Sequence, residues 1–297
     1  MARTIRRLVV ALAAAAAGTY AAGAALLWRS PDRFMDFPEP EAPHSPGMLG
    51  IEYREVWLRA GPNRALVHGW WLPNGREAPA VLVLPGTGRS KAGMVHTAAA
   101  IHAAGAAVLM IDYRGLGRSD RGPLTESSMY EDAEAAWHEL RWHQPDAGRR
   151  FVYGHSLGAA PALELAARYP DVNGVAIEGA PTSMRELLRG SWVDALYPVD
   201  AMLAGRFDPA GKLGRLSAPI LVIHGKRDRI VPPAMGVELY MRATGRKSLL
   251  LVEDAAHSDA AAVGAGAYQG AVEQLLAPSV TRALARLTPR AAPSRAG

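Results

Sequence analysis

The chain of 297 residues contains no cysteine. This absence excludes disulfides, thiolate metal sites, a cysteine nucleophile and a lipid-modified cysteine. The pairs His96 with His102 and His138 with His143 lack the i, i+4 spacing of helical zinc ligands. No complete glycine motif for binding phosphate or a dinucleotide is present. The sequence therefore predicts neither a metal nor a cofactor.

Acidic residues are absent from both ends of the chain, which has a net charge of +5. Residues 1–29 and residues 278–297 each carry four arginines and no acid, and without these eight charges the middle has a net charge of −3. A nucleic-acid-binding protein concentrates positive charge on its folded domain, so we expect no nucleic-acid partner. Basic flanks fit a position beside a membrane better.

The N-terminal segment Leu8–Trp28 has no charged residue. Its length is enough to cross a bilayer as a helix. Three arginines precede it, which predicts a cytoplasmic start and an exported remainder, in a single-pass protein of the cell membrane. A cleaved signal peptide is the alternative and would give a secreted or periplasmic protein, but the apolar run continues past the small residues of "TYAAGA". We therefore favour an uncleaved anchor.

Four regions follow from composition. Residues 1–29 form the anchor or signal segment, and residues 30–47 form a proline-rich spacer. Residues 48–277 form the main domain, and residues 278–297 form a basic tail rich in alanine and proline that we expect to be disordered.

Within the main domain, unbroken apolar runs alternate with helical segments. This rhythm predicts an α/β protein with a mostly parallel, eight-stranded sheet covered by helices on both faces. Binding sites in such sheets lie at the carboxyl ends of the strands. The mixed segment 181–216 predicts a small helical cap. Its apolar side chains either line a pocket for an acyl group or pack on the domain: Met184, Leu187, Leu188, Trp192, Leu196, Tyr197, Met202 and Leu203.

The stretch "FVYGHSLGAAPALELA" places a serine between two glycines where a strand becomes a helix. Gly154, Ser156 and Gly158 fit the pattern G-x-S-x-G, in which a strained turn exposes the serine hydroxyl and the glycines permit close backbone approach. The following helix N-terminus offers N–H groups that stabilise an oxyanion. Ser156 is therefore the candidate nucleophile.

A serine nucleophile requires a base and an acid, which follow it in the order acid, then histidine. His224 and His257 are the histidines downstream of Ser156, and His257 follows the last predicted strand. Asp228 lies just beyond the preceding strand and can orient His257. We predict the triad Ser156, Asp228 and His257, with Glu178 as the alternative acid.

The oxyanion requires two backbone donors. One is the N–H of Leu157, the residue after the nucleophile, and the other comes from the loop after an early strand. "VLPGTGRSK" is this loop, and Thr87 is the candidate donor.

The combination of "DYRGLGRSD", "GHSLG", "HGKRDRIVPP" and "AAHSD" resembles the α/β-hydrolase superfamily between about Ile51 and Leu276. It is similar to a branch of membrane-anchored serine hydrolases that act as monoacylglycerol or lysophospholipid lipases and protein depalmitoylases. The resemblance implies that residues 112–115 form a structural turn beside the site. One departure is the oxyanion loop, where Pro85-Gly86-Thr87 replaces the usual His-Gly-Asn.

These observations predict a serine hydrolase that cleaves esters or thioesters with an apolar acyl group through an acyl-enzyme intermediate, on a small-molecule or lipid substrate. Two alternatives are a serine peptidase on the same fold and a membrane-tethered binding module without catalytic activity.

Overall fold

A computed structural model describes residues 2–29, 45–87 and 90–277. Most of the predicted spacer, residues 30–44, and the predicted tail, residues 278–297, lie outside the described residues. The sheet has eight strands in the order β1-β2-β4-β3-β5-β6-β7-β8. β2 is antiparallel to both β1 and β4, and every other neighbouring pair is parallel. The predicted mostly parallel, eight-stranded sheet is confirmed.

The strands are β1 (Arg54–Ala60), β2 (Ala65–Leu72), β3 (Ala80–Leu84), β4 (Ala107–Ile111), β5 (Arg150–His155), β6 (Val175–Glu178), β7 (Ile220–Gly225) and β8 (Lys247–Val252). The helices are α1 (Ala2–Arg29), α2 (Val95–Ala103), α3 (Glu126–His143), α4 (Ala159–Arg168), α5 (Met184–Leu188), α6 (Trp192–Leu196), α7 (Val199–Met202), α8 (Pro209–Lys212), α9 (Pro233–Arg242), α10 (Ala260–Val263) and α11 (Ala265–Leu276). Short 3₁₀ turns are η2 (Pro46–Leu49), η3 (Lys91–Met94), η4 (Ala147–Arg149), η5 (Ser156–Gly158) and η6 (Leu213–Arg215).

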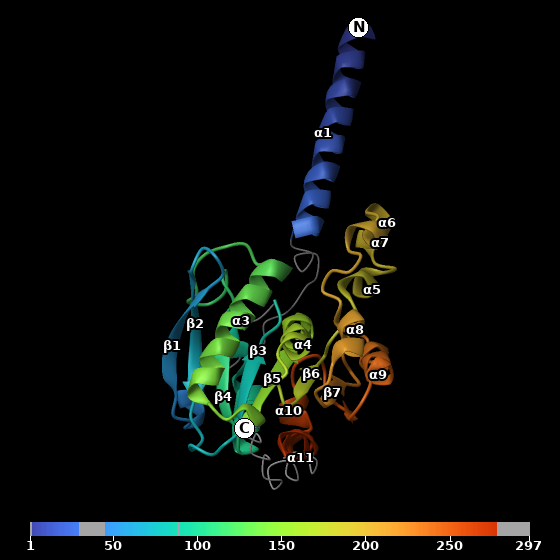
Figure 1. Cartoon of the computed structure of the whole chain (residues 1–297). Helices are drawn as coiled ribbons and strands as arrows, with labels where there is room; N and C mark the ends of the chain where they lie inside the picture. Colours follow the sequence, from blue (N-terminus) through green and yellow to red (C-terminus); the bar gives the residue numbers. More distant parts are fainter. Residues whose placement is uncertain (1, 30–44, 88–89, 278–297) are drawn as a thin grey trace, which may run out of the picture.

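The central strands are apolar on both faces because helices cover both faces (Figure 1). In β3 the side chains of Leu82 and Leu84 belong to the core under α3 and α4, while Val81 and Val83 belong to the core under α2 and α11. Side chains alternate between the faces of a strand, so a doubly covered strand requires an unbroken apolar run. This is why the central strands appear in the sequence as unbroken apolar runs.

The helix α3 begins directly after Thr125. The Thr125 hydroxyl accepts a hydrogen bond from Ser128 N at 3.1 Å, and the Ser128 hydroxyl accepts one from Thr125 N at 2.8 Å. This reciprocal capping satisfies two backbone donors that a helix start otherwise leaves open. This N-cap fixes the point at which the chain segment that leaves β4 at the carboxyl edge of the sheet ends and α3 begins.

A helical cap connects β6 to β7 and contains α5, α6, α7 and α8. It follows the carboxyl end of β6, so it lies at the same edge of the sheet as the segments that leave β5, β7 and β8 (Figure 1). The helix α1 extends away from this edge and is long and apolar enough to cross a membrane. The predicted cap between residues 181 and 216 is confirmed.

Candidate active site

The turn between β5 and α4 holds Ser156 in a strained conformation. Its φ is +52°, in the left-handed region that a residue with a side chain rarely adopts. That conformation costs about 1 kcal/mol, and such strain is concentrated at functional sites. The strand ends at His155 and η5 begins at Ser156, so the sequence located this turn correctly.

Two glycines make the turn possible. A Cβ atom on Gly158 would overlap the carbonyl oxygens of Leu84 and Pro85, and a Cβ atom on Gly154 would overlap the backbone of Ala159. The turn therefore presses directly against the end of β3, where the predicted oxyanion loop begins. These steric contacts explain why both outer positions of the G-x-S-x-G motif require glycine.

The carboxylate of Asp228 and the imidazole of His257 form a buried pair. Asp228 follows β7 and His257 follows β8, and Nδ1 of His257 lies 2.7 Å from Oδ2 of Asp228. Oδ1 of Asp228 accepts hydrogen bonds from the backbone N–H groups of Ile230 and Val231 at 2.8 and 2.9 Å. Both carboxylate oxygens are thus engaged, and the carboxylate faces His257 in a fixed orientation.

His224 is a second histidine on the same carboxylate. It is fully buried in β7, and its Nε2 lies 2.9 Å from the carbonyl oxygen of Val231 and 3.2 Å from Oδ2 of Asp228. Burial alone would raise the pKa of Asp228, but the hydrogen bonds from His224, His257 and Val231 outweigh it and lower that pKa well below its usual range. Asp228 is therefore an anion at any pH at which the protein would work.

The position of His257 is set by two neighbouring strands. Nε2 of His155 lies 2.9 Å from the carbonyl oxygen of His257, and the two rings are 5.0 Å apart in an edge-to-face arrangement. Gly179, which follows β6, has a φ of +57°, and a Cβ atom there would lie 3.2 Å from Nδ1 of His257. His257 thus lies against the residue that precedes Ser156 and against the end of β6.

Sequence reasoning missed His155, His224 and Gly179 as parts of the site. His155 is the variable residue of the G-x-S-x-G motif, and His224 lies four residues before Asp228 in the chain. That i, i+4 spacing is the one sequence signal that could have linked His224 to the acid. The contact of His155 with residue 257 has no such local signal, because it joins the end of β5 to a loop 102 residues further along the chain.

His155 is therefore expected to position His257, which gives a first prediction. Replacing His155 by phenylalanine removes the donor to the His257 carbonyl while keeping a ring, so kcat should fall about 10- to 100-fold with KM changed much less. The measurement is steady-state hydrolysis of a soluble ester, together with the melting temperature. Replacing His155 by glutamine, which retains an N–H donor, should recover part of the rate. Equal losses in both variants, or a loss confined to KM, would contradict the positioning role.

The alternative acid, Glu178, makes different contacts. Its carboxylate accepts a hydrogen bond from the Tyr153 hydroxyl, which itself accepts one from the Tyr268 hydroxyl at 3.0 Å. Burial, then the nearby Glu178 carboxylate, raises the pKa of Tyr153 far above its usual value, so Tyr153 stays protonated as a donor. The structure places Asp228 at hydrogen-bonding distance from Nδ1 of His257 and places Glu178 in this tyrosine network.

The predicted oxyanion donors lie on the two backbone segments that meet at Ser156. Leu157 is buried at the start of η5, and a Cβ atom on Gly86 would lie 3.0 Å from Cβ of Ser156. Thr87 is the next residue after Gly86 and is 8% exposed. The loop that carries Thr87 therefore reaches Ser156, as the predicted role of Thr87 as a backbone donor requires.

The far end of this loop is tied to the turn after β4. Oδ1 of Asp112 accepts a hydrogen bond from Lys91 N at 2.6 Å, and Oδ2 of Asp112 forms a buried ion pair with Lys91 Nζ. The Lys91 ammonium also lies 4.4 Å from the centre of the Trp70 ring, a cation–π geometry. Together these contacts hold the start of the segment "DYRG" against the loop beside the site.

His68, which lies close enough to Lys91 and Asp112 to feel their charges, gives a second prediction, which concerns stability. Burial, aided by the positive charges of Lys91 and Arg118, lowers its pKa to about 4. Unfolded histidine has a pKa of about 6.5, so the neutral side chain stabilises the fold above pH 6.5 and this contribution is lost as the pH falls towards 4. The loss amounts to roughly 3 kcal/mol by pH 4, and about 2 kcal/mol of it falls between pH 7 and pH 5. Urea unfolding at pH 7 and pH 5 measures it, and a His68→Gln variant should show a clearly smaller difference between the two pH values. An equal difference in both proteins would rule His68 out as the cause.

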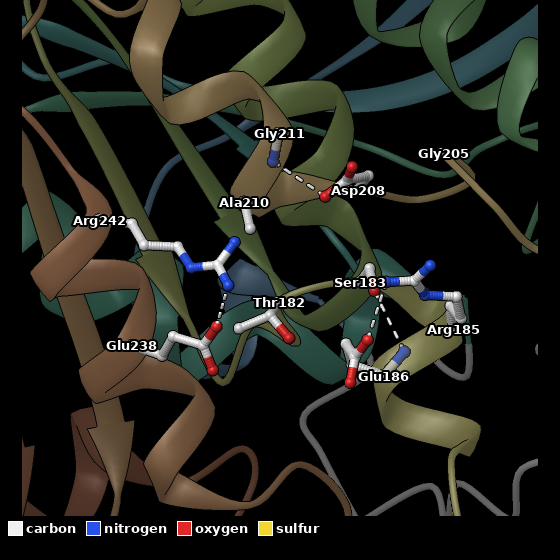
Figure 2. Close-up of a pocket in the computed structure, with 10 residues that line it drawn as sticks. All are labelled: Thr182, Ser183, Arg185, Glu186, Gly205, Asp208, Ala210, Gly211, Glu238 and Arg242. Carbon is white, nitrogen blue, oxygen red and sulfur yellow. Dashed lines mark hydrogen bonds and ion pairs between the residues drawn. The ribbon is translucent and has the colours of Figure 1, made fainter. Parts of the chain in front are cut away.

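A polar cavity of about 320 Å³ lies at the base of the cap, between α5, α8 and α9 (Figure 2). Its charged lining is largely paired within itself: Arg242 with Glu238 at 2.6 Å and Arg185 with Glu186 at 3.0 Å. Ser156, Asp228 and His257 are not among the lining residues. Such a lining does not suit an acyl chain, so this cavity is separate from the predicted acyl site.

The apolar residues of the cap fall into three groups. Met184, Leu188 and Leu203 are buried in the core, and Leu187, Tyr197 and Met202 are partly buried. Trp192 and Leu196 are exposed to 60% and 56%. Packing on the domain therefore accounts for the first group, whereas the exposed pair requires another explanation.

Among the residues that the structure describes, no cluster of three or more histidines and carboxylates could hold a metal ion.

Comparisons with known proteins agree with the fold. The family model described as "Serine aminopeptidase, S33" matches residues 75–209, which include the turn at Ser156 and end before Asp228. An uncharacterised protein of Mycobacterium tuberculosis is 30% identical over 254 residues, which cover 84% of this chain and 86% of the relative. The human α/β hydrolase domain-containing protein 17B is 32% identical over 155 residues, 51% of this chain and 50% of that protein.

Solved structures resemble the fold. An esterase from Pyrococcus furiosus superimposes with a TM-score of 0.65 at 22% identity, covering 82% of this chain and 96% of the esterase. An esterase from Exiguobacterium antarcticum gives a TM-score of 0.58 at 14% identity, covering 75% and 99%. The chain belongs to the α/β-hydrolase superfamily and is a hydrolase.

Proposed function

We propose that the protein is a serine hydrolase that cleaves carboxylic esters or thioesters with an apolar acyl group. The observation that supports this most strongly is the arrangement at the carboxyl edge of the sheet. A strained serine between two sterically required glycines follows β5, and a buried carboxylate–imidazole pair follows β7 and β8. These are the three groups that acyl transfer by a serine requires.

In the proposed mechanism, His257 removes the proton from the Ser156 hydroxyl as the oxygen attacks the acyl carbonyl. Asp228 holds the Nδ1–H of His257 and stabilises the imidazolium that forms. The backbone N–H groups of Leu157 and Thr87 stabilise the oxyanion. His257 then protonates the leaving alcohol or thiol. Water activated by His257 releases the acid and restores Ser156.

The test is covalent labelling combined with turnover. The full chain in detergent is treated with a fluorophosphonate, the modified residue is identified by mass spectrometry, and p-nitrophenyl esters of increasing chain length are assayed in parallel. We expect modification of Ser156 and hydrolysis that increases with chain length up to the size of the acyl site. Folded protein that neither reacts nor turns over would favour a tethered binding module instead.

A peptidase is the second candidate, because the matching family model is described as a serine aminopeptidase. Such an enzyme requires a carboxylate that binds the substrate's free amino group. Glu178, the acid at the end of β6, does not suit this role, because its carboxylate is buried in the core and accepts a hydrogen bond from Tyr153. Assaying amino-acid p-nitroanilides beside the esters distinguishes the two, and faster amide than ester cleavage would support the peptidase.

We also propose that α1 is an uncleaved membrane anchor. It contains 28 residues, and most of its side chains are exposed in the structure, unlike those of a core helix. The competing possibility is a signal sequence. The intact mass of the purified membrane-bound protein distinguishes them, because cleavage removes more than 2 kDa.

A further inference from the structure

The end of α1 is packed against the cap. The Tyr20 ring stacks on the Tyr197 ring with centroids 5.0 Å apart, and Gly23 provides the space for the Tyr197 hydroxyl. Arg206 of the cap donates a hydrogen bond to the carbonyl oxygen of Trp28 and lies 5.1 Å from its ring. Leu27 is completely buried in this contact. The helix and the cap therefore share a fixed geometry at residues 20–28.

This geometry sets the depth of the cap relative to a membrane. Tyr20 precedes Trp28 by eight residues, so it lies about 12 Å farther back along the helix. The apolar stretch Leu8–Trp28 just matches the roughly 30 Å of a bilayer core, so its outer boundary falls near Trp28. A side chain stacked on Tyr20 then lies on the lipid side of that boundary. Tyr197 and the helix α6 before it cannot remain in bulk water while α1 spans.

The surface of α6 suits that position. Trp192 and Leu196 expose most of their area, a cost in water that contact with lipid removes. Beside them, Arg189 forms an ion pair with Asp200 of α7 at 2.8 Å, and the Asp194 carboxylate accepts a hydrogen bond from Gly190 N at 2.9 Å. Aromatic rings, exposed apolar side chains and arginines at one level are typical of the membrane interface.

The same arrangement orients the catalytic edge. The cap leaves β6 and returns to β7, so it lies at the edge where the segments carrying Ser156, Asp228 and His257 also emerge, and α1 extends from that side of the molecule (Figure 1). We propose that the α6 tip, residues 192–197, inserts into the leaflet beside α1, so that the active site opens against the bilayer and takes acyl esters held in it. The substrate part of this inference rests on the proposed serine hydrolase, and the insertion rests on the proposed anchor role of α1.

The absence of native cysteine allows a direct test. Single-cysteine variants of the full chain are labelled with an environment-sensitive fluorophore, reconstituted into phosphatidylcholine–phosphatidylglycerol vesicles, and quenched with lipids that carry a nitroxide near the headgroup. Leu196→Cys is the test position, and Val10→Cys within α1 is the positive control. Trp142→Cys is the matched control, because Trp142 is 76% exposed and lies near the C-terminal end of α3, which is not part of the cap.

We expect at least two-fold stronger quenching at position 196 than at position 142. Quenching at 196 as weak as at 142, with position 10 quenched normally, would overturn the insertion. If α6 instead meets a second copy of the chain, energy transfer between labels on different chains would replace lipid quenching, which would also overturn it. None of these readouts needs catalysis, so a failure of the proposed activity stays distinguishable.

A kinetic experiment tests the substrate part. Replacing Leu196 by aspartate should raise KM about ten-fold for an acyl ester embedded in vesicles and leave turnover of a short soluble ester unchanged. The control variant Met241→Asp changes another exposed apolar residue, on α9, and should affect neither substrate. Equal effects of Leu196→Asp on both substrates would contradict access from the bilayer.

Discussion

Replacing Ser156 by alanine is expected to lower kcat/KM for a soluble ester by at least about ten-thousand-fold. Removal of the nucleophile eliminates the acyl-enzyme route and leaves only binding and oxyanion stabilisation, which support slow attack by water. Measuring the loss requires protein free of contaminating esterases, so the same preparation should also fail to react with a fluorophosphonate. Turnover within ten-fold of the original protein would remove Ser156 from the mechanism.

The fold should survive this change, because alanine leaves the backbone of the turn intact. The informative comparison is Ser156→Gly, which is equally inactive but adopts the φ of +52° without a clash. We expect the free energy of unfolding of the glycine variant to be about 1 kcal/mol higher than that of the alanine variant, measured by urea unfolding. A matched control is Ser191→Ala, which removes the N-cap of α6 and should cost about 1 kcal/mol without affecting soluble-ester turnover.

The elements predicted best are those whose evidence is local in the chain. The turn at Ser156 needs a strand, two glycines and a helix within about twenty residues, and all of them can be read from the sequence. The unbroken apolar run of β3 is likewise sufficient, because both faces of that strand are covered by helices. The pairing of Asp228 with His257 required one more assumption, that parallel strands end at a common edge, and the contact of 2.7 Å agrees with it.

The parts that the sequence could not predict depend on contacts between distant loops. His155 meets the His257 carbonyl only because the end of β5 and the chain segment after β8 converge across two intervening strands. The contact of Tyr20 with Tyr197 joins an apolar N-terminal helix to a cap segment with no motif in common. Composition identified the helix and the cap separately, but the direction in which each side chain points depends on tertiary packing.

The same limitation explains why two acids remained candidates. Asp228 and Glu178 each follow or end a strand of the parallel sheet, so both emerge at the edge where His257 lies. Side-chain direction separates them. The Asp228 carboxylate receives two backbone N–H groups and faces His257, whereas the Glu178 carboxylate faces the Tyr153 hydroxyl.

Replacing Asp228 by asparagine is therefore expected to lower kcat by about a thousand- to ten-thousand-fold while changing KM little. The amide presents an N–H group to Nδ1 of His257, which forces the proton onto Nε2, and that nitrogen then cannot accept the proton of Ser156. Because its hydrogen bonds keep the pKa of Asp228 below its usual range, the carboxylate stabilises the fold above pH 4 and loses this contribution as the pH falls further. The asparagine variant should therefore show a weaker loss of stability than the original protein below pH 4, measured by urea unfolding.

The matched control for the acid is Glu178→Gln, in which the amide oxygen still accepts the hydrogen bond from Tyr153. Its kcat should stay within about three-fold of the original value, because Glu178 then supports packing of the core and takes no part in orienting the imidazole. The reverse result, a large loss in Glu178→Gln with Asp228→Asn nearly active, would transfer the role of the acid to Glu178. A third result is a loss of kcat in both single variants that is not additive in the double variant. It would mean that the two carboxylates act on His257 through one connected network, because residues that function as a unit do not affect the rate independently.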